Sequence, residues 1–327
     1  GTPRSSVAGA MLLWDTRLQR PAQRHCCSAS MPDPIRVAII GLDTSHAVEY
    51  PRRMQAPDCA EELRVPGLRA VSCLRFPSAF QNESGQDQRQ AQLVNWGVRV
   101  APDITDALRD VDAVMLEIND PTLHLPWFAQ VVALGKPVYI DKPLADSAQA
   151  GAEIIRLATA HRLRLFSSSP LRSDATLNIT CAALPRPHQV AVYGPLGTAP
   201  TGSSVLWYGV HAVEMLNRAM GRGAAAVSAR RDACGVTLIV DYLEQRRGVV
   251  ELTAGVWIYG GTLRDNTTAR TFSVDSAAIY SAHLRDIERF FRGGEPLASL
   301  DDALEILRIL AAADRSLASG HSETIQP

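Results

Sequence analysis

Short apolar runs alternate with amphipathic stretches in the first half of the chain. Residues 35–40 are apolar except for Arg36, and similar runs recur at regular intervals as far as residue 166. Runs of this kind predict strands buried on both faces of a parallel sheet. The strands we expect cover residues 35–40, 68–74, 98–100, 113–118, 138–140 and 163–166, and the helices cover residues 45–54, 87–96, 104–108, 123–134 and 147–161. Regular alternation of strand and helix predicts an α/β fold, a Rossmann-like doubly wound parallel sheet over residues 31–168.

The pattern changes after the serine run at residues 167–169. The expected strands now follow one another, interrupted by a single helix at residues 209–220, and the chain closes with helices at 277–291 and 300–319. These strands cover residues 189–193, 225–229, 236–242, 249–253 and 270–274. Strands that do not alternate with helices predict a largely antiparallel sheet. We therefore expect a C-terminal α+β domain over residues 169–327.

Composition narrows the functional classes. The formal net charge of −1 provides no basic stripe for nucleic acid, and no apolar run reaches the roughly 18 residues that span a bilayer. The six cysteines have no paired metal-ligand spacing, which favours reduced thiols in a cytoplasmic protein. Residues 1–30 contain four arginines and one acid without a clear period, so we expect a leader or extension outside the fold. The expected partner is a small molecule rather than nucleic acid or a membrane.

The turn after the first expected strand begins at Gly41, where a dinucleotide-binding protein has Gly-x-Gly-x-x-Gly. Asp43 and His46 occupy the second and third glycine positions. A carboxylate about 5 Å from a phosphate costs on the order of 3 kcal/mol at an effective dielectric near 20. The following helix N-terminus, with the hydroxyls of Thr44 and Ser45, can still attract an anion. The sequence therefore predicts a cofactor in a shifted pose, or no cofactor.

Other strand ends bring polar side chains to the same edge of the sheet, where open α/β sheets bind ligands. Arg75 follows the second expected strand and favours the 2′-phosphate of NADP over the ribose of NAD. Glu117 and Asn119 end the fourth strand. Together with Asp43 and His46 they could bind a metal. These residues do not have the tight spacing of a metal-binding motif, so we expect no metal. Lys142 follows the fifth strand, where a lysine can hold a hydroxyl or donate a proton to a developing alkoxide.

Candidate residues of the second domain lie near its interrupting helix. His211 and Glu214 share one face of that helix, and a histidine there could act as acid or base or could equally be a core residue. Trp207 and Tyr208 could stack on a ring or belong to the core. Two further polar residues at the junction of the domains could bind substrate hydroxyls or a carboxylate, or could simply be linker residues: Ser168 and Arg172.

Taken together, these motifs resemble the glucose–fructose oxidoreductase / inositol dehydrogenase (Gfo/Idh/MocA) family, from residue 35 to residue 319. The family has a strand-ending Asn, a His five residues later, and then Gly-Lys-x-Val-x-x-Glu-Lys-Pro. Asn119, His124 and residues 135–143 match, with Asp141 in place of the Glu. A second family motif opens a helix of the substrate domain, and its counterparts here are Gly209, Val210, His211 and Glu214.

The resemblance implies an NAD(P)-dependent oxidoreductase acting on a hydroxyl or carbonyl of a sugar, cyclitol or related molecule. It implies Lys142 and His211 as catalytic residues, although Trp207 replaces the family's catalytic Asp. The cofactor residues would be Gly41, Asp43, Thr44, Ser45, His46, Arg75, Glu117, Asn119, His124 and Lys142, and the substrate residues Ser168, Arg172, Trp207, Tyr208 and His211. It also implies an open-faced second sheet, a final helix packed back on the first domain, and a homodimer or homotetramer.

Two alternatives remain open because the glycine turn and the catalytic Asp are replaced. One is a non-redox enzyme, a lyase, isomerase or hydrolase, that uses the same cleft. The other is a non-catalytic ligand-binding relative.

Overall fold

The computed structural model describes residue 1 and residues 33–326. Residues 33–326 form one compact unit. The extension expected at residues 1–30, with Cys26 and Cys27, lies outside the described residues apart from Gly1. No helix in the described part of the chain is long and apolar enough to cross a bilayer.

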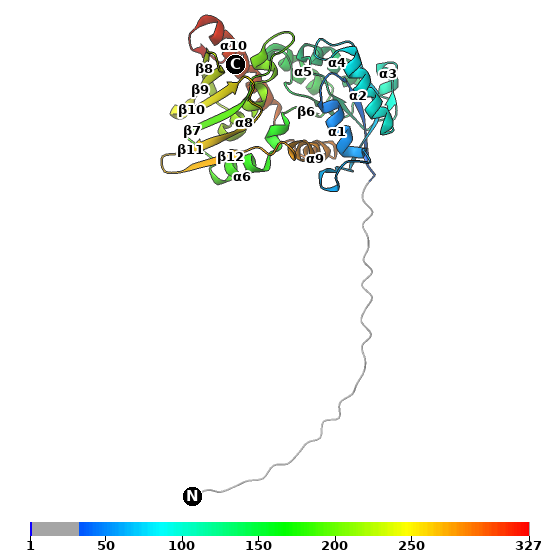
Figure 1. Ribbon diagram of the computed structural model, residues 1–327, viewed down its shortest axis with the longest axis horizontal. Helices are drawn as coiled ribbons and strands as arrows, with labels where there is room; N and C mark the ends of the chain where they lie inside the picture. The colour runs from blue at the N-terminus through cyan, green and yellow to red at the C-terminus, as the bar shows by residue number, and fades with distance from the viewer. Residues whose placement is uncertain (2–32, 327) are drawn as a thin grey trace. The chain divides into compact units, whose positions relative to one another are not determined.

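A six-stranded parallel sheet forms the first half of the compact unit (Figure 1). Its strands are β1 (Ile35–Ile40), β2 (Leu68–Leu74), β3 (Arg99–Val100), β4 (Ala113–Leu116), β5 (Val138–Ile140) and β6 (Leu165–Phe166). Their order is β3-β2-β1-β4-β5-β6, and every pair is parallel. This is the doubly wound Rossmann order, which confirms the expected fold class. The order reverses between β1 and β4, and ligands bind beside such a reversal, at the carboxyl ends of the strands.

Five α-helices connect these strands, and side-chain caps fix several of their starts. They are α1 (His46–Gln55), α2 (Glu83–Asn95), α3 (Ile104–Ala107), α4 (His124–Val131) and α5 (Ala148–Ala160), with 3₁₀ turns η1 (Glu61–Leu63), η2 (Pro121–Leu123) and η3 (Val132–Leu134). Helix α2 begins four residues before the expected start because the Asn82 side chain accepts a hydrogen bond from Gly85 N. The Ser147 side chain caps α5 in the same way.

The second sheet has seven strands in the order β12-β11-β7-β10-β9-β8-β13. They are β7 (Gln189–Pro195), β8 (Ala224–Arg231), β9 (Gly235–Tyr242), β10 (Arg246–Thr253), β11 (Gly260–Arg264), β12 (Ala269–Ser273) and β13 (Glu323–Thr324). The β7–β10 pair is parallel and the other five pairs are antiparallel, so the sheet is largely antiparallel as expected. The expected strands did not include β11 and β13.

Helices cover one face of this second sheet. They are α6 (Ala175–Ala183), α7 (Ser204–Trp207), α8 (Val210–Met220) and α10 (Leu300–Ser319), and the remaining turns are η4 (Pro170–Ser173) and η5 (Leu243–Gln245). Val236, Leu238 and Val240 of β9 are buried towards this layer, whereas Ile239 and Asp241 between them are exposed. The alternation leaves the opposite face of the sheet open.

The last two helices return to the first sheet. Helix α9 (Ile279–Phe291) buries Leu284, Ile287 and Phe290 in the same hydrophobic cluster as Val37 and Ile39 of β1. Helix α10 packs against α5 as well as against β8. The two sheets are therefore joined by a shared core, which fixes the cleft between them.

Candidate functional site

A cavity of about 330 Å³ lies at the carboxyl edge of the parallel sheet, where the α7–α8 segment approaches it. The residues that line it come from both halves of the compact unit. They are Asp43, Thr44, Ser45, His46, Phe80, Arg89, Asn119, Lys142, Pro170, Leu171, Trp207, Tyr208, His211, Tyr259, Ser276, Ile279 and Tyr280. Its volume falls in the range of small-molecule sites. We call it the central cavity.

Gly41 makes the tight turn that a dinucleotide site needs at its first position. Its φ is 101°, and a Cβ added there would lie 2.3 Å from the carbonyl oxygen of Glu117. Any other residue would therefore be strained and would collide with the end of β4. The turn keeps the first of the three glycine roles.

Both carboxylate oxygens of Asp43 accept hydrogen bonds within the protein. Its Oδ1 accepts a hydrogen bond from Asn119 N at 2.7 Å, and its Oδ2 accepts one from the Ser78 hydroxyl at 2.6 Å. Burial raises the pKa of Asp43. On α2, Arg89 lines the same cavity and donates to the carbonyl of Leu42 at 2.8 Å. Two donors and a nearby cation therefore offset much of the phosphate repulsion expected for an acid here.

The His46 ring forms a hydrogen bond with Asp141, the residue that precedes Lys142. Its Nδ1 lies 2.9 Å from Asp141 Oδ1, and its ring contacts Tyr50 and Tyr280. Lys142 Nζ lies 3.6 Å from the other oxygen, Asp141 Oδ2. Although burial acts to raise it, the pKa of Asp141 is held well below its usual range by His46 and Lys142. Asp141 therefore positions both side chains at the edge of the cavity.

Glu117 is fully buried behind this group. Neither of its carboxylate oxygens has a hydrogen-bond partner among the described residues, and burial raises its pKa well above the usual range. It does not line the central cavity, so its expected role as a direct cofactor contact is not what the structure shows. An apolar strand end holds the carboxylate under the turn instead of presenting it to the cleft.

His211 faces the central cavity, and Ser169 fixes its ring. Ser169 Oγ lies 2.7 Å from His211 Nδ1, which leaves Nε2 as the ring nitrogen available to a ligand. Burial, with the nearby positive charges of Lys142 and His46, holds the pKa of His211 well below its usual value. The imidazole is therefore neutral near pH 7 and can accept a proton.

Three predicted site residues belong to structural contacts outside the cavity. His124 is fully buried, with Nε2 2.8 Å from the carbonyl oxygen of Ile118 and Nδ1 3.2 Å from that of Leu144. Arg172 is 4% exposed and pairs with Glu214 at 2.8 Å, and Ser168 is 1% exposed. None of these three side chains lines the central cavity, because tertiary packing holds them in the core.

Trp207 and Tyr208 form the aromatic wall of the cavity. Trp207 donates through Nε1 to Asn119 Oδ1 at 2.8 Å, which joins the two halves across the cleft. Phe80 lies 5.4 Å from the Trp207 ring, and Trp257, which is 62% exposed, lies 5.5 Å from the Tyr208 ring. The sequence reasoning missed Phe80, Arg89 and Tyr280. The aromatic residues carried no motif, and Arg89 sits among polar residues of α2.

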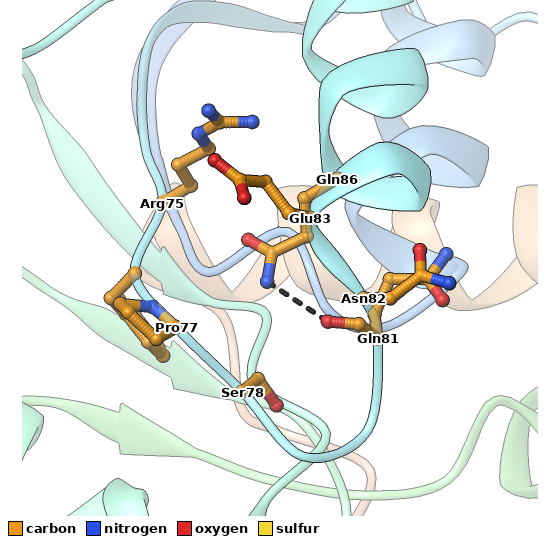
Figure 2. A pocket seen from close by; sticks show the side chains of 8 residues that line it. Arg75, Pro77, Ser78, Gln81, Asn82, Glu83 and Gln86 are labelled. Atoms are coloured by element: carbon orange, nitrogen blue, oxygen red, sulfur yellow. Dashed lines mark hydrogen bonds between the residues drawn. The ribbon is translucent and has the colours of Figure 1, made fainter.

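A second cavity, of about 400 Å³, lies beside the end of β2. Figure 2 shows the polar side chains that line it, from residues 75–82 between β2 and α2 and from the first turns of α2. Arg75 is there, but it is paired with Asp87, and Glu83 lines the same space. Gln86 also lines it and donates to the carbonyl of Gln81 at 3.2 Å. The lining of this cavity therefore includes a carboxylate, side-chain amides and an arginine whose charge is paired with Asp87.

The loop of residues 75–82 lies between the two cavities. Ser78 lines the second cavity and bonds to Asp43, which lines the central one, while Phe80 contacts Trp207 of the opposite half. A dinucleotide has an adenosine end at β2 and a nicotinamide end across the β1–α1 turn. The residues at both ends suit it, and the Ser78–Asp43 and Phe80–Trp207 contacts lie between these ends.

The first half of the chain is similar in sequence to known proteins. Residues 35–169 match an oxidoreductase family with an NAD-binding Rossmann fold, the Gfo/Idh/MocA family. A curated relative, inositol 2-dehydrogenase of Rubrobacter xylanophilus, is 29% identical over 150 residues, which cover 45% of this chain and 38% of the relative. The match thus spans well under half of that relative's length.

Solved structures share the two-part fold at low identity. GenD2 of gentamicin A biosynthesis, solved in complex with NAD, superposes with a TM-score of 0.73 at 18% identity and covers 90% of this chain and 97% of its own. The myo-inositol dehydrogenase of Lactobacillus casei, in complex with NAD(H) and myo-inositol, gives 0.71 at 14% identity, with coverage of 90% and 97%. Through residues 35–169, the chain is similar to the Gfo/Idh/MocA oxidoreductase family.

Proposed function

We propose that the protein is an NAD(P)-dependent oxidoreductase that acts on a hydroxyl or carbonyl group of a sugar, cyclitol or related small molecule. The observation that carries the proposal is the joint placement of Lys142 and His211 on one cavity beside a Rossmann turn. The family match of residues 35–169 and the inositol 2-dehydrogenase relative support the reaction class.

The residues that would hold the cofactor lie on both sides of the β1–α1 turn. The N-terminus of α1, with Thr44 and Ser45, and the Arg89 guanidinium offer donors and positive charge to a diphosphate. Within the described chain Ser45 forms no side-chain cap on α1, and Thr44 Oγ1 accepts a hydrogen bond from His46 N at 3.3 Å.

The cavity beside β2 favours NAD over NADP, which reverses the preference drawn from Arg75 in the sequence. The Arg75 charge is already paired with Asp87, and Glu83 adds a carboxylate to the same space. A 2′-phosphate would meet this negative charge, whereas a ribose diol can donate hydrogen bonds to a carboxylate. We expect NADH to bind at least tenfold more tightly than NADPH.

Lys142 and His211 divide the proton chemistry between them. A bound nicotinamide would give or accept the hydride. The Lys142 Nζ atom, positioned by Asp141, would stabilise charge on the reacting oxygen. His211, neutral and fixed through Ser169, would take the hydroxyl proton at Nε2 during oxidation and return it during reduction. Trp207 replaces the family's catalytic Asp, so Ser169 takes over the orienting of the histidine.

The open face of the second sheet is the surface through which we propose that subunits pair, as a homodimer or homotetramer. Ile239 of β9 is 40% exposed on that face. Light scattering on the purified full chain would test the assembly. A monomer at micromolar concentration would contradict it.

The chain has two lysines, which makes a matched test of the reaction possible. With NAD⁺ and a panel of cyclitols and sugars, Lys142→Met should lower turnover about 10²–10⁴-fold. Lys136→Met, the same change at an exposed site six residues earlier, should leave turnover unchanged. Equal activity of both variants would remove Lys142 from the mechanism.

One observation favours a second candidate, a non-redox enzyme that uses the same cavity. The Ser78–Asp43 and Phe80–Trp207 contacts hold the loop of residues 75–82 against residues that line the central cavity. If they do not open, the central cavity still accommodates a small substrate beside Lys142, Asp43 and His211. Turnover of a polyol without added nucleotide would favour this candidate over the oxidoreductase.

A further inference from the structure

We propose that His46, Glu117 and Asp141 form a binding site for one divalent transition-metal ion. One ligand atom from each of the three side chains lies within 4.8 Å of the other two. The residues come from the start of α1, the end of β4 and the end of β5, which meet at the carboxyl edge of the sheet. The spacing of these residues in the sequence had given no reason to expect a metal.

The unpartnered oxygens of the group are the first independent observation. Glu117 is fully buried, and both of its oxygens, with Asp141 Oδ2, lack a hydrogen-bond partner within the described residues. A buried polar group without a partner costs roughly 1–3 kcal/mol, and more when it is charged. Unpartnered carboxylate oxygens close to an imidazole nitrogen are explained if an ion lies among them.

The charges of the neighbouring side chains are also compatible with a bound cation. Lys142 approaches Asp141 at 3.6 Å and so offsets one carboxylate, while Glu117 is left without a counter-charge in contact. A divalent ion would allow both carboxylates to ionise together.

A metal ion could take the place of the proton that His46 Nδ1 and Asp141 Oδ1 share in their hydrogen bond. His46 Nδ1 and Asp141 Oδ1 lie 2.9 Å apart, so both atoms can reach one ion through bonds of roughly 2.0–2.2 Å. Glu117 would supply the third ligand. Three protein ligands leave coordination positions open, as in catalytic rather than structural sites. His46 borders the central cavity, so a ligand there could approach the ion.

The ligand chemistry indicates the class of metal. One imidazole nitrogen with two carboxylate oxygens suits Mn²⁺, Fe²⁺ or Zn²⁺ better than Ca²⁺ or Mg²⁺, which prefer oxygen alone. The site does not depend on the oxidoreductase proposal, because none of its three ligands needs a nucleotide.

The test is titration of the full chain with MnCl₂ and with ZnCl₂ after treatment with EDTA, followed by calorimetry and manganese EPR, without nucleotide. We expect one ion per chain with a dissociation constant in the micromolar range or below. Glu117→Gln and His46→Gln should each weaken binding at least tenfold. Glu305→Gln, a buried acid that instead accepts from Gly223 N and Ala224 N, should leave binding unchanged.

Two outcomes would overturn the proposal: no saturable binding of either ion up to millimolar concentration, or unchanged binding in both site variants. Glu117→Gln is isosteric and removes an unpaired charge, so it should fold; circular dichroism verifies this. If one variant fails to fold, the other decides the question. Because the titration contains no nucleotide, its result is separable from the test of redox activity.

Discussion

Buried charges in and around the cleft are held in specific contacts. Asp43 accepts two hydrogen bonds, Asp141 lies between His46 and Lys142, and Glu214 accepts from Arg172 and from Ser169 N. Apart from Asp141–Lys142, each contact joins segments that are distant in the sequence. The acid and the imidazole that replace two glycines are thus used to tie the turn to β4, β5 and residues 75–82.

Breaking the buried Arg172–Glu214 pair should destabilise the fold without touching the cavity. Arg172→Met leaves an uncompensated buried carboxylate, and we expect the free energy of unfolding to fall by about 3–5 kcal/mol. Adding Glu214→Leu should recover much of the loss. Arg186→Met, in an exposed pair with Glu244, should cost less than about 1 kcal/mol. Urea unfolding measures all three; a loss below 1 kcal/mol for Arg172→Met would contradict the structural role.

His283 should make the fold sensitive to acid. Burial, with the positive charge of His46, lowers the pKa of His283 to about 3. The unfolded chain therefore binds one more proton than the folded chain between about pH 3 and the ordinary histidine pKa near 6.5. Stability from this group is complete above about pH 6.5 and falls by roughly 2 kcal/mol at pH 5.

His283→Gln should remove this part of the pH dependence, as measured by the free energy of unfolding at pH 5 and pH 7.5. The matched control is His161→Gln, because His161 is exposed. Identical slopes for the wild type and His283→Gln would show that His283 is not kept neutral.

The loop of residues 75–82 is the element that decides how a long ligand enters. The Phe80–Trp207 contact is an aromatic pair of the kind that contributes about 0.5–1.5 kcal/mol. If the closed loop competes with a dinucleotide, Phe80→Ala should raise the open fraction and tighten apparent NADH binding about two- to tenfold. Leu108→Ala, a change away from this loop, serves as the control. Weaker binding in Phe80→Ala would mean that Phe80 contacts the cofactor instead.

Elements with strong local signals were predictable from sequence. Helix α10 has the expected bounds because Ser299 and Asp302 form a capping box and Gly320 ends the helix with φ of 74°. Strand β11 was missed because Gly260 and Gly261 lower strand propensity. Their missing side chains make room for Tyr193 and Phe272, which only the folded sheet reveals.

At the scale of the whole molecule, the sequence pattern predicted both sheets but not how they share a core. The return of α9 to β1 depends on packing between residues some 250 positions apart, which no local period encodes. The same limit explains the site. Lys142 and His211 were predicted from motifs and do line one cavity, whereas His124, Ser168 and Arg172 proved to be buried. Whether a polar residue faces a cleft or the core depends on this long-range packing.

The proposed oxidoreductase activity depends on a nicotinamide nucleotide entering the cleft, and calorimetric titration of the full chain with NADH tests this directly. We expect one saturable site per chain with a dissociation constant of about 1 μM to 1 mM, and weaker binding of NADPH. Parallel titration of Phe80→Ala separates a closed loop from a missing site. Absence of NADH binding at millimolar concentration in both proteins would contradict the oxidoreductase proposal.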